Sequence, residues 1–235
     1  MKFSIITVNF NNKAGIIKTI ESVVKQTFND FEFIVIDGCS TDGSVEYIID
    51  NSNFFSYWVS ENDKGVYHAM NKGLKIAKGD YCIFLNSGDY FHDSNVLKNA
   101  LSLIKYNPSL VYGLIEWENT KQLWNPRRDL KDYEMAFQSL IPHQGCFFDT
   151  ELVKKMGGYQ EKYKVISDWG LMLQLIQHKF EIQKIDMLVS ICEKQGISSS
   201  LEHKIIKERL DFLFRHSFST FIKGCLYKIK KYLIS

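Results

Sequence analysis

The sequence predicts an α/β fold in which a mostly parallel central sheet is flanked by helices. Short apolar runs alternate with helical patterns over the first hundred residues, which is typical of a parallel sheet covered by helices. Several of these runs end in polar, turn-rich segments, as expected where parallel strands meet a ligand-binding crevice. With 235 residues and 45% hydrophobic content, the chain can bury a sizeable core.

The first hundred residues contain the clearest elements. Buried strands are predicted over residues 3–8, 31–36, 55–59 and 81–85. Between them, apolar residues at helical spacing predict helices within residues 16–24, 45–49 and 66–76.

The pattern is less regular after residue 89. Helices are predicted over residues 96–104 and 168–177, and strands over residues 110–117, 121–124, 144–148 and 187–192, of which 110–117 and 121–124 form an antiparallel pair. No internal repeat or Pro/Gly-rich linker interrupts the chain. We therefore expect one domain over residues 1–200, followed by a helical, basic segment at residues 201–235.

Charge and cysteine content bound the class of protein. The net charge of +2 is too small to indicate a nucleic-acid partner. Five scattered cysteines without a CxxC pair favour free thiols in a reducing compartment. No apolar stretch reaches 18 residues, and no signal-peptide pattern opens the chain, so a cytoplasmic protein is expected.

The C-terminal stretch combines lysines with apolar residues. Lys223, Lys228, Lys230 and Lys231 alternate with Ile, Leu and Tyr. This pattern is typical of a helix at an anionic membrane surface, and equally of a surface helix packed on its own domain. The protein is thus expected to be cytoplasmic, with a peripheral place on the inner face of the membrane as one interpretation.

Polar residues follow the first two predicted strands. The cluster Thr7-Val8-Asn9-Phe10-Asn11-Asn12 precedes a helix, where an Asn or Thr could cap the first turn or face a ligand. Asp37 ends the second strand, where a carboxylate can accept a hydrogen bond from a base imide or a ribose hydroxyl. An ordinary turn aspartate explains Asp37 as well.

Two further polar clusters lie later in the first half. Asp63 and Gly65 precede a helix whose N-terminal amides can attract an anion. The turn Asn86-Ser87-Gly88-Asp89 follows a buried strand and suits a metal-bound diphosphate, although Asp89 could simply end that strand. The absence of GxxxxGK[ST] and of GxGxxG after the first strand argues against a P-loop NTPase and a standard dinucleotide-binding oxidoreductase.

Five motifs, in this order, resemble those of family 2 glycosyltransferases of the GT-A fold. They are ITVNFNN (6–12), FIVIDGCSTDGS (33–44), the Ala69, Asn71 and Gly73 pattern, Ala77 with Gly79 and Asp80, and FLNSGD (84–89). The resemblance is strong over about residues 3–100 and looser to about residue 190. It implies transfer of a sugar from a nucleotide-diphosphate donor, with inversion at the anomeric carbon.

The resemblance also implies roles for residues of the first half. It makes residues 1–100 the nucleotide-sugar half and residues 101–200 the acceptor half. Thr7, Asn9 and Asp37 match positions that line the nucleotide pocket, with Asp37 near a uracil, so that UDP is the expected nucleotide. Asp63 and Gly65 match a loop close to the nucleotide and its phosphates.

The FLNSGD motif departs from the family pattern. Asn86 and Gly88 stand where many relatives carry aspartate, so Asp89 is the one carboxylate left to bind a divalent cation, Mg²⁺ or Mn²⁺, with Asn86 beside it as a substrate-binding residue. Such a cation can be held by one carboxylate together with substrate phosphates and water.

The acceptor half carries three candidate residues. The resemblance implies that Asp168 is the general base, although Ser167 replaces the acid that commonly precedes it. Trp169 could stack on an acceptor sugar or belong to the core. His143 could bind substrate or be a structural histidine; likewise Asp168 could simply favour the helix dipole.

Two other classes of function stay open at this stage. A sugar nucleotidyltransferase could use a similar sheet, but it would need a basic, Gly-rich loop to hold a triphosphate where this chain has NFNNKAG. A catalytically inactive nucleotide-sugar binding module would fit the depleted acidic motif. For an active enzyme, the resemblance implies a saccharide or lipid-linked saccharide acceptor in bacterial surface-polysaccharide assembly.

Overall fold

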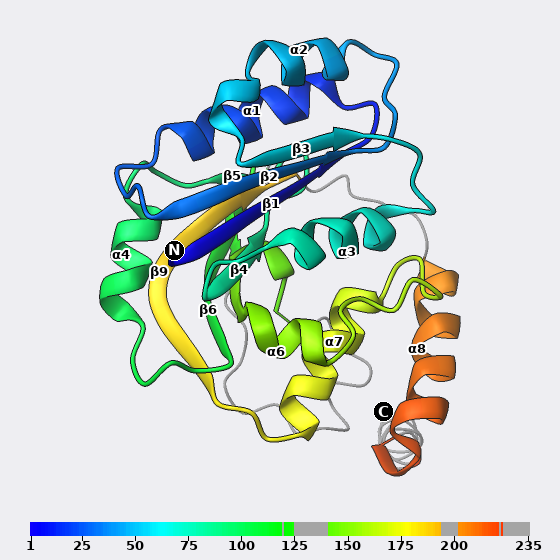
Figure 1. Ribbon diagram of the computed structural model, residues 1–235. Coiled ribbons are helices and arrows are strands. Elements are labelled where there is room, and N and C mark those ends of the chain that lie inside the picture. The colour runs from blue at the N-terminus through cyan, green and yellow to red at the C-terminus, as the bar shows by residue number, and fades with distance from the viewer. Residues whose placement is uncertain (119, 125–140, 194–201, 221, 223–235) are drawn as a thin grey trace.

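A mixed sheet runs through the molecule, and helices cover both of its faces (Figure 1). The computed structural model describes residues 1–118, 120–124, 141–193, 202–220 and 222. Its strands are β1 (Phe3–Asn9), β2 (Phe31–Asp37), β3 (Tyr57–Ser60), β4 (Tyr81–Phe84), β5 (Tyr90–Phe91), β6 (Leu110–Trp117), β7 (Gln122–Trp124), β8 (Cys146–Asp149) and β9 (Ile182–Cys192). They lie in the order β3-β2-β1-β4-β8-β6-β9-β5, and β7 pairs with β6.

The helices occur mainly between strands. They are α1 (Lys13–Val24), α2 (Ser44–Asp50), α3 (Val66–Ile76), α4 (Val96–Leu103), α6 (Thr150–Lys155), α7 (Ser167–Gln177) and α8 (Glu202–His216), with short 3₁₀ turns η1 (Ser52–Phe54) and η2 (His143–Gly145). Figure 1 shows α1 and α2 on one face of the sheet and α3, α6 and α7 on the other.

The first half of the sheet is parallel, as predicted. β1 pairs with β2 and β4, and β2 pairs with β3, all in parallel. β1 is buried along its whole length, which explains why its sequence is a continuous apolar run rather than an alternating one. The register places Asn9 beside Asp37 and Asp37 beside Ser60, so these polar residues gather at the carboxyl edge.

The second half of the sheet is mixed. β8 is antiparallel to both β4 and β6, whereas β9 is parallel to β6. The predicted antiparallel pair over residues 110–117 and 121–124 is confirmed as β6 and β7. The two-residue strand β5 and the helix α6 were not predicted, because neither is long enough to show a periodic pattern.

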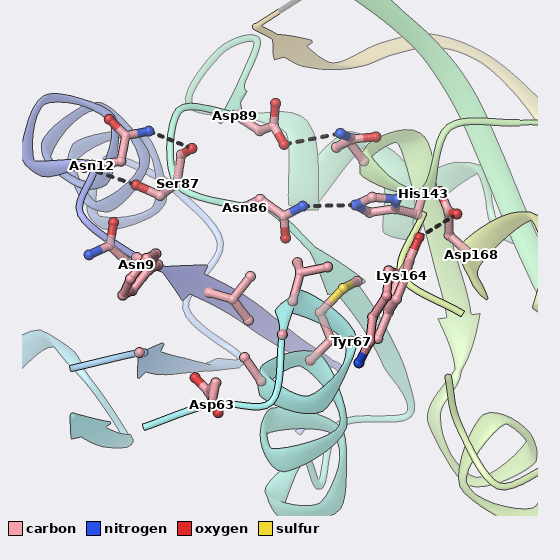
Figure 2. A pocket seen from close by; sticks show the side chains of 18 of the residues that line it. Asn9, Asn12, Asp63, Tyr67, Asn86, Ser87, Asp89, His143, Lys164 and Asp168 are labelled. Atoms are coloured by element: carbon pink, nitrogen blue, oxygen red, sulfur yellow. Dashed lines mark hydrogen bonds and ion pairs between the residues drawn. The ribbon is translucent and has the colours of Figure 1, made fainter. Parts of the chain in front are cut away.

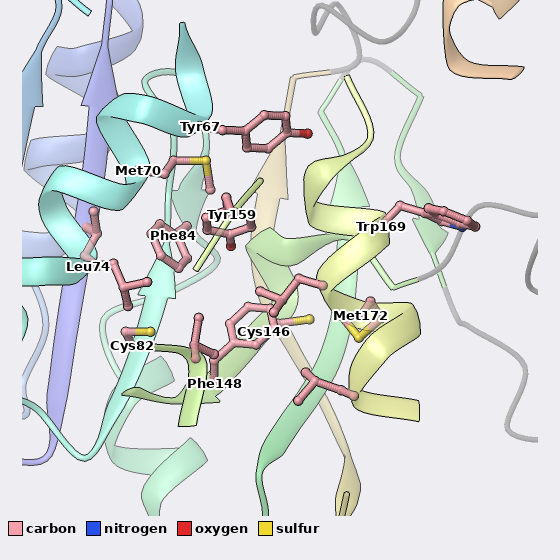
Figure 3. Packing of buried hydrophobic residues seen from close by; sticks show 14 of the residues in the cluster. Tyr67, Met70, Leu74, Cys82, Phe84, Cys146, Phe148, Tyr159, Trp169 and Met172 are labelled. Atoms are coloured by element: carbon pink, nitrogen blue, oxygen red, sulfur yellow. The ribbon is translucent and has the colours of Figure 1, made fainter. Parts of the chain in front are cut away.

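The hydrophobic core lies on both sides of the sheet. Figure 3 shows part of the cluster on the α3 and α7 side, where Phe84 of β4 packs against Tyr159 and Phe148 at centroid distances of 5.1 and 6.4 Å. Phe212 and Leu213 of α8 belong to the same cluster. The helix α8, which follows residue 200, therefore packs against the same hydrophobic core.

The C-terminal basic stretch from Phe221 to Ser235, apart from Ile222, lies outside the described residues. Cys39, Cys82, Cys146 and Cys192 are free thiols. Within the described ranges, no helix has the length and apolar character needed to cross a bilayer.

Candidate active site

Residues from both halves of the chain line one open pocket of about 810 Å³ (Figure 2). The predicted site residues that line it are Asn9, Asp63, Gly65, Asn86, Asp89, His143 and Asp168. Thr7, Asp37 and Trp169 are buried and do not line it. The pocket thus brings together residues from the first hundred positions and residues from positions 101–200.

The turn at residues 86–89 is fixed from the start of α1. Asn12 caps α1 by accepting from the Gly15 N–H, and its Nδ2 donates to the carbonyl of Ser87 at 3.1 Å. Thr19 of α1 donates its hydroxyl to the carbonyl of Asp89 at 2.8 Å. The helix-cap interpretation of this polar cluster is therefore correct for Asn12, and the same cap holds the ligand-facing turn in place.

Asp37 is fully buried, and both of its carboxylate oxygens are already satisfied. Oδ1 accepts from Asn9 Nδ2 and the Ser40 hydroxyl, and Oδ2 accepts from the Ser40 N–H and the Ser60 hydroxyl. Burial opposes ionisation, but the hydrogen bonds from Ser40, Ser60 and Asn9 outweigh it and lower the pKa of Asp37. In this structure Asp37 orients Asn9, which lines the pocket in its place.

Two polar groups at the end of β1 lack partners. Asn9 is 4% exposed, and its Oδ1 has no hydrogen-bond partner among the described residues. Thr7 is fully buried, and its Oγ1 is likewise without one in the same part of the chain. Because buried polar groups are normally paired, the Asn9 oxygen that lines the pocket is suited to accept from a bound ligand.

The start of α3 forms another wall of the pocket. Gly65 precedes the helix with a φ of 125°, a conformation that favours glycine, and no side chain caps the first turn. The amides of that turn can therefore meet an anion. Asp63 lines the pocket while pairing with Lys72 at 2.6 Å and His68 at 3.0 Å.

Asp89 is a buried carboxylate at the end of the turn. It is 6% exposed and accepts from Gln144 Nε2 at 3.1 Å, and burial raises its pKa to about 6. The described residues contain no group of three or more His, Cys, Asp or Glu that could hold a metal ion. The donor set fits a divalent cation that takes one carboxylate from the protein and its other ligands from diphosphate and water, because such a cation would relieve the cost of the buried charge.

Asp168 begins α7 and faces the pocket. Its side chain is 29% exposed, and it accepts from the Tyr67 hydroxyl at 2.8 Å and from His143 Nδ1 at 3.2 Å. Burial alone would raise the pKa of Asp168, but the hydrogen bonds and charge of His143, with the hydroxyl of Tyr67, hold it below its ordinary value. Asp168 is thus a carboxylate at neutral pH, as a general base must be.

His143 lies between Asp168 and the turn at residues 86–89. Its Nε2 is 3.3 Å from Asn86 Nδ2, and Figure 2 shows the three side chains in a row across the pocket. The sequence did not single out Tyr67 or Gln144. Each stands next to a motif that was recognised, Tyr67 two residues after Gly65 and Gln144 directly after His143, but their roles depend on contacts between distant segments.

Trp169 is a core residue in this structure. It is 5% exposed, packs edge-on against Phe212 at 5.6 Å, and has the guanidinium of Arg209 over its ring at 5.0 Å. Residues of α8 therefore cover the ring, and of the two alternatives for Trp169, stacking on an acceptor sugar or a place in the core, the structure shows the second. Side-chain direction explains the difference, since Asp168 and Trp169 are neighbours on a helix and point to different sides.

The fold and this pocket are those of a GT-A glycosyltransferase. The model of the family described as glycosyl transferase family 2 matches residues 4–163, and the chain belongs to this family. It is 30% identical over 219 residues to a "PGL/p-HBAD biosynthesis glycosyltransferase" of Mycobacterium bovis, covering 88% of this chain and 83% of the relative. It is 24% identical to a glycosyltransferase of Haemophilus influenzae, covering 92% of this chain and 77% of that protein.

Solved structures support the same fold. The chain is similar to residues 1–349 of S. aureus TarS in complex with UDP-GlcNAc, with a TM-score of 0.71, 21% identity and coverage of 92% of this chain and 74% of TarS 1–349. It is also similar to the mannosyltransferase PcManGT of Pyrobaculum calidifontis in complex with GDP-Man and Mn²⁺, with a TM-score of 0.70, 16% identity and coverage of 96% and 69%.

Proposed function

We propose that this glycosyltransferase moves a hexose from a UDP-sugar to a hydroxyl of a saccharide acceptor, with inversion and with Asp168 as the general base. The observation that carries the proposal is the Asp168 carboxylate, which is ionised, partly exposed to the pocket and held by two donors. The UDP-GlcNAc complex of TarS supports the choice of nucleotide. Inversion follows from direct attack on the anomeric carbon, opposite the leaving diphosphate.

The residues of the pocket would have separate roles in the reaction. Asp168 would take the proton of the acceptor hydroxyl as that oxygen attacks the anomeric carbon. Asn9 would bind the nucleotide through its unpartnered oxygen, held in place by Asp37. The open first turn of α3 at Gly65 would meet negative charge on the diphosphate.

Asp89 would hold a divalent cation, Mg²⁺ or Mn²⁺. The Mn²⁺ in the PcManGT complex and the buried carboxylate of Asp89 support this role. When bound, the cation would neutralise charge that develops on the leaving diphosphate. Gln144 would orient the Asp89 carboxylate through its 3.1 Å hydrogen bond.

A panel of UDP-, GDP- and dTDP-sugars with simple saccharide acceptors tests the proposed function. We expect a UDP-sugar to raise the melting temperature most and to release UDP, and NMR of the product to show an inverted anomeric configuration. Retention of configuration would overturn the mechanism. Pyrophosphate release from a nucleoside triphosphate and a sugar phosphate would instead identify a nucleotidyltransferase, and donor binding without transfer an inactive binding module.

A lipid-linked acceptor and a peripheral place on the inner face of the cell membrane complete the proposal. The four lysines of the C-terminal stretch support it, since each basic group near an anionic surface contributes about 1 kcal/mol. Removing residues 221–235 should release the protein from anionic vesicles at low salt while transfer to a soluble acceptor continues. Failure of the full-length protein to bind those vesicles would contradict the membrane placement.

A further inference from the structure

Four side chains from four separate elements form one chain of hydrogen bonds beside the pocket. Asn86 of the turn after β4 contacts His143 of η2, His143 contacts Asp168 of α7, and Asp168 accepts from Tyr67 of α3. The donor-side turn is thereby connected to the candidate general base on the acceptor side. This connection is independent of any ligand.

The chemistry of the chain fixes the direction of each hydrogen bond. Asp168 is an ionised acceptor, so His143 must present Nδ1 to it as an N–H donor, at 3.2 Å. In a neutral imidazole, Nε2 is then a bare acceptor, and the group facing it at 3.3 Å must be a donor. The amide Nδ2 of Asn86 satisfies that requirement, whereas an aspartate at position 86 could not.

We propose that Asn86 is a positioning residue for the general base: its amide N–H donates to Nε2 of His143, so that this imidazole presents its Nδ1–H to Asp168. The inference rests on the proposed role of Asp168. The tautomer itself is a property of the ligand-free protein and can be measured without turnover.

The other end of the Asn86 amide points to a link with substrate. Its Oδ1 is buried and has no hydrogen-bond partner among the described residues, while Asn86 lines the pocket. Buried acceptors are normally paired, so a hydroxyl or N–H of a bound substrate is the natural partner for this oxygen. A substrate that donates to Oδ1 would fix the amide in the orientation that the His143 tautomer needs.

The charged groups around Asp168 and His143 determine what a change in the NMR signals of His143 can mean. Among the described residues, the titratable and charged groups that interact with Asp168 or His143 are Tyr67 of α3, Asp89 of the turn, Cys146 of β8, Tyr159, and Arg209 of α8. None of these groups contacts Nε2 of His143 in the described residues. A change at Nε2 therefore reports on Asn86.

Nitrogen NMR of ¹⁵N-histidine-labelled protein tests the proposal directly. The chain has six histidines, and His143→Gln assigns the His143 signals by their loss. In the neutral imidazole of His143 we expect the proton on Nδ1. A proton on Nε2 in the wild-type protein would overturn the proposal.

Asn86→Asp is the sharpest variant, because it keeps the size of the side chain and replaces the donor by an acceptor. We expect Nε2 of His143 to carry a proton in this variant, because the carboxylate that faces it can only accept, and turnover to fall by about 10- to 100-fold, as for other groups that orient a functional imidazole. The dissociation constant for UDP should change much less. Unchanged His143 signals in this variant would also overturn the proposal.

Asn62→Asp is the matched control. Asn62 is exposed and lines the same pocket, so the change adds the same charge without a contact to His143. We expect its His143 signals to match those of the wild type; an equal change would mean that pocket charge alone sets the tautomer. If Asp168→Asn kept full turnover, the general-base assignment would fail while the tautomer result stood by itself.

Discussion

Asp37 and Asp168 are two carboxylates, the first fully buried and the second partly exposed, whose partners come from different distances along the chain. All the donors to Asp37 come from the parallel half of the sheet, within 28 residues of it. Asp168 depends on Tyr67, which is 101 residues away and belongs to the other half. The surroundings of Asp37 are thus complete within residues 1–100, whereas those of Asp168 need both parts of the chain to be assembled.

This difference predicts that substitutions around the two carboxylates will change different properties of the protein. Substitutions around Asp37 should affect the stability and donor affinity of the parallel half, while substitutions around Asp168 should affect the reaction. The comparison would fail if both kinds of change lowered affinity and turnover together.

The largest effect is expected for Asp168→Asn. Loss of general-base catalysis should lower turnover by about 10²- to 10⁴-fold, because proton removal from the acceptor is lost while the shape of the side chain is kept. Donor affinity, measured by calorimetry, should stay close to that of the wild type. Turnover near the wild-type value would remove Asp168 from the mechanism.

Asp37→Ala should act on the nucleotide side. The substitution leaves three donors without their acceptor, namely the Ser40 N–H and the hydroxyls of Ser40 and Ser60, whereas Asn9 Nδ2 keeps the Ser40 hydroxyl oxygen at 3.2 Å. Each buried donor without a partner costs about 1–3 kcal/mol, so the free energy of unfolding should fall by about 3 kcal/mol or more. Donor affinity should weaken more than turnover at saturating donor, because Asn9 loses its support.

Asp50→Ala is the control for Asp37→Ala, since Asp50 is exposed at the end of α2. Urea unfolding and donor titration should leave this control unchanged. A fall in turnover of Asp37→Ala with unchanged donor affinity would contradict the division between the two halves.

The parallel half was also the part of the fold that the sequence predicted best. β1 and β2 are buried throughout or nearly so, and burial of both faces requires the continuous apolar runs that can be recognised in a sequence. Asn9, Asp63, Gly65, Asn86 and Asp89 could be placed at the pocket because each lies at or shortly after the carboxyl end of a parallel strand, β1, β3 or β4.

The acceptor half shows what local pattern cannot determine. Trp169 and Asp168 are adjacent in sequence, and only packing against α8 decides that the ring enters the core while the carboxylate faces the pocket. The hydrogen bond from Tyr67 to Asp168 joins residues in two elements whose proximity follows from the whole sheet. No spacing or periodicity carries that information.

Asp89→Asn should stabilise the protein in the absence of metal. The pKa of Asp89 is raised to about 6 in the folded protein, against an ordinary value of 3.8 for an aspartate. The protonated form of Asp89 therefore contributes favourably to the free energy of unfolding. This contribution is fully present below the pKa of the unfolded chain and is lost as the pH rises through about 6. A shift of roughly 2 units corresponds to about 3 kcal/mol, which the uncharged amide should recover at pH 7.5.

Urea unfolding in EDTA at pH 7.5 and at pH 4 measures this effect. The stability difference between Asp89→Asn and the wild type should be present at pH 7.5 and should nearly vanish at pH 4. Added Mn²⁺ should raise the melting temperature of the wild type and leave that of the variant almost unchanged. A variant that is less stable than the wild type at pH 7.5 would show that the carboxylate stabilises the turn by itself.

The smallest effect, and the most specific test of the link between the two halves, is expected for Tyr67→Phe. The Tyr67 hydroxyl is one of the groups that hold the pKa of Asp168 below its ordinary value. Its removal should therefore raise that pKa and move the acidic limb of the kcat/KM profile to higher pH by about 1 unit, since hydrogen bonds to charged groups are worth about 1.5–3 kcal/mol. At pH 7.5 Asp168 remains ionised in the variant, so turnover there should fall by less than about tenfold.

Tyr159→Phe is the control. It removes a hydroxyl from the ring stacked on Tyr67 at 5.5 Å, and that hydroxyl has no hydrogen-bond partner in the part of the chain that the structure describes. The acidic limb of Tyr159→Phe should coincide with that of the wild type, and an equal shift in both variants would mean that ring packing, not the hydroxyl on Asp168, sets the titration of the base.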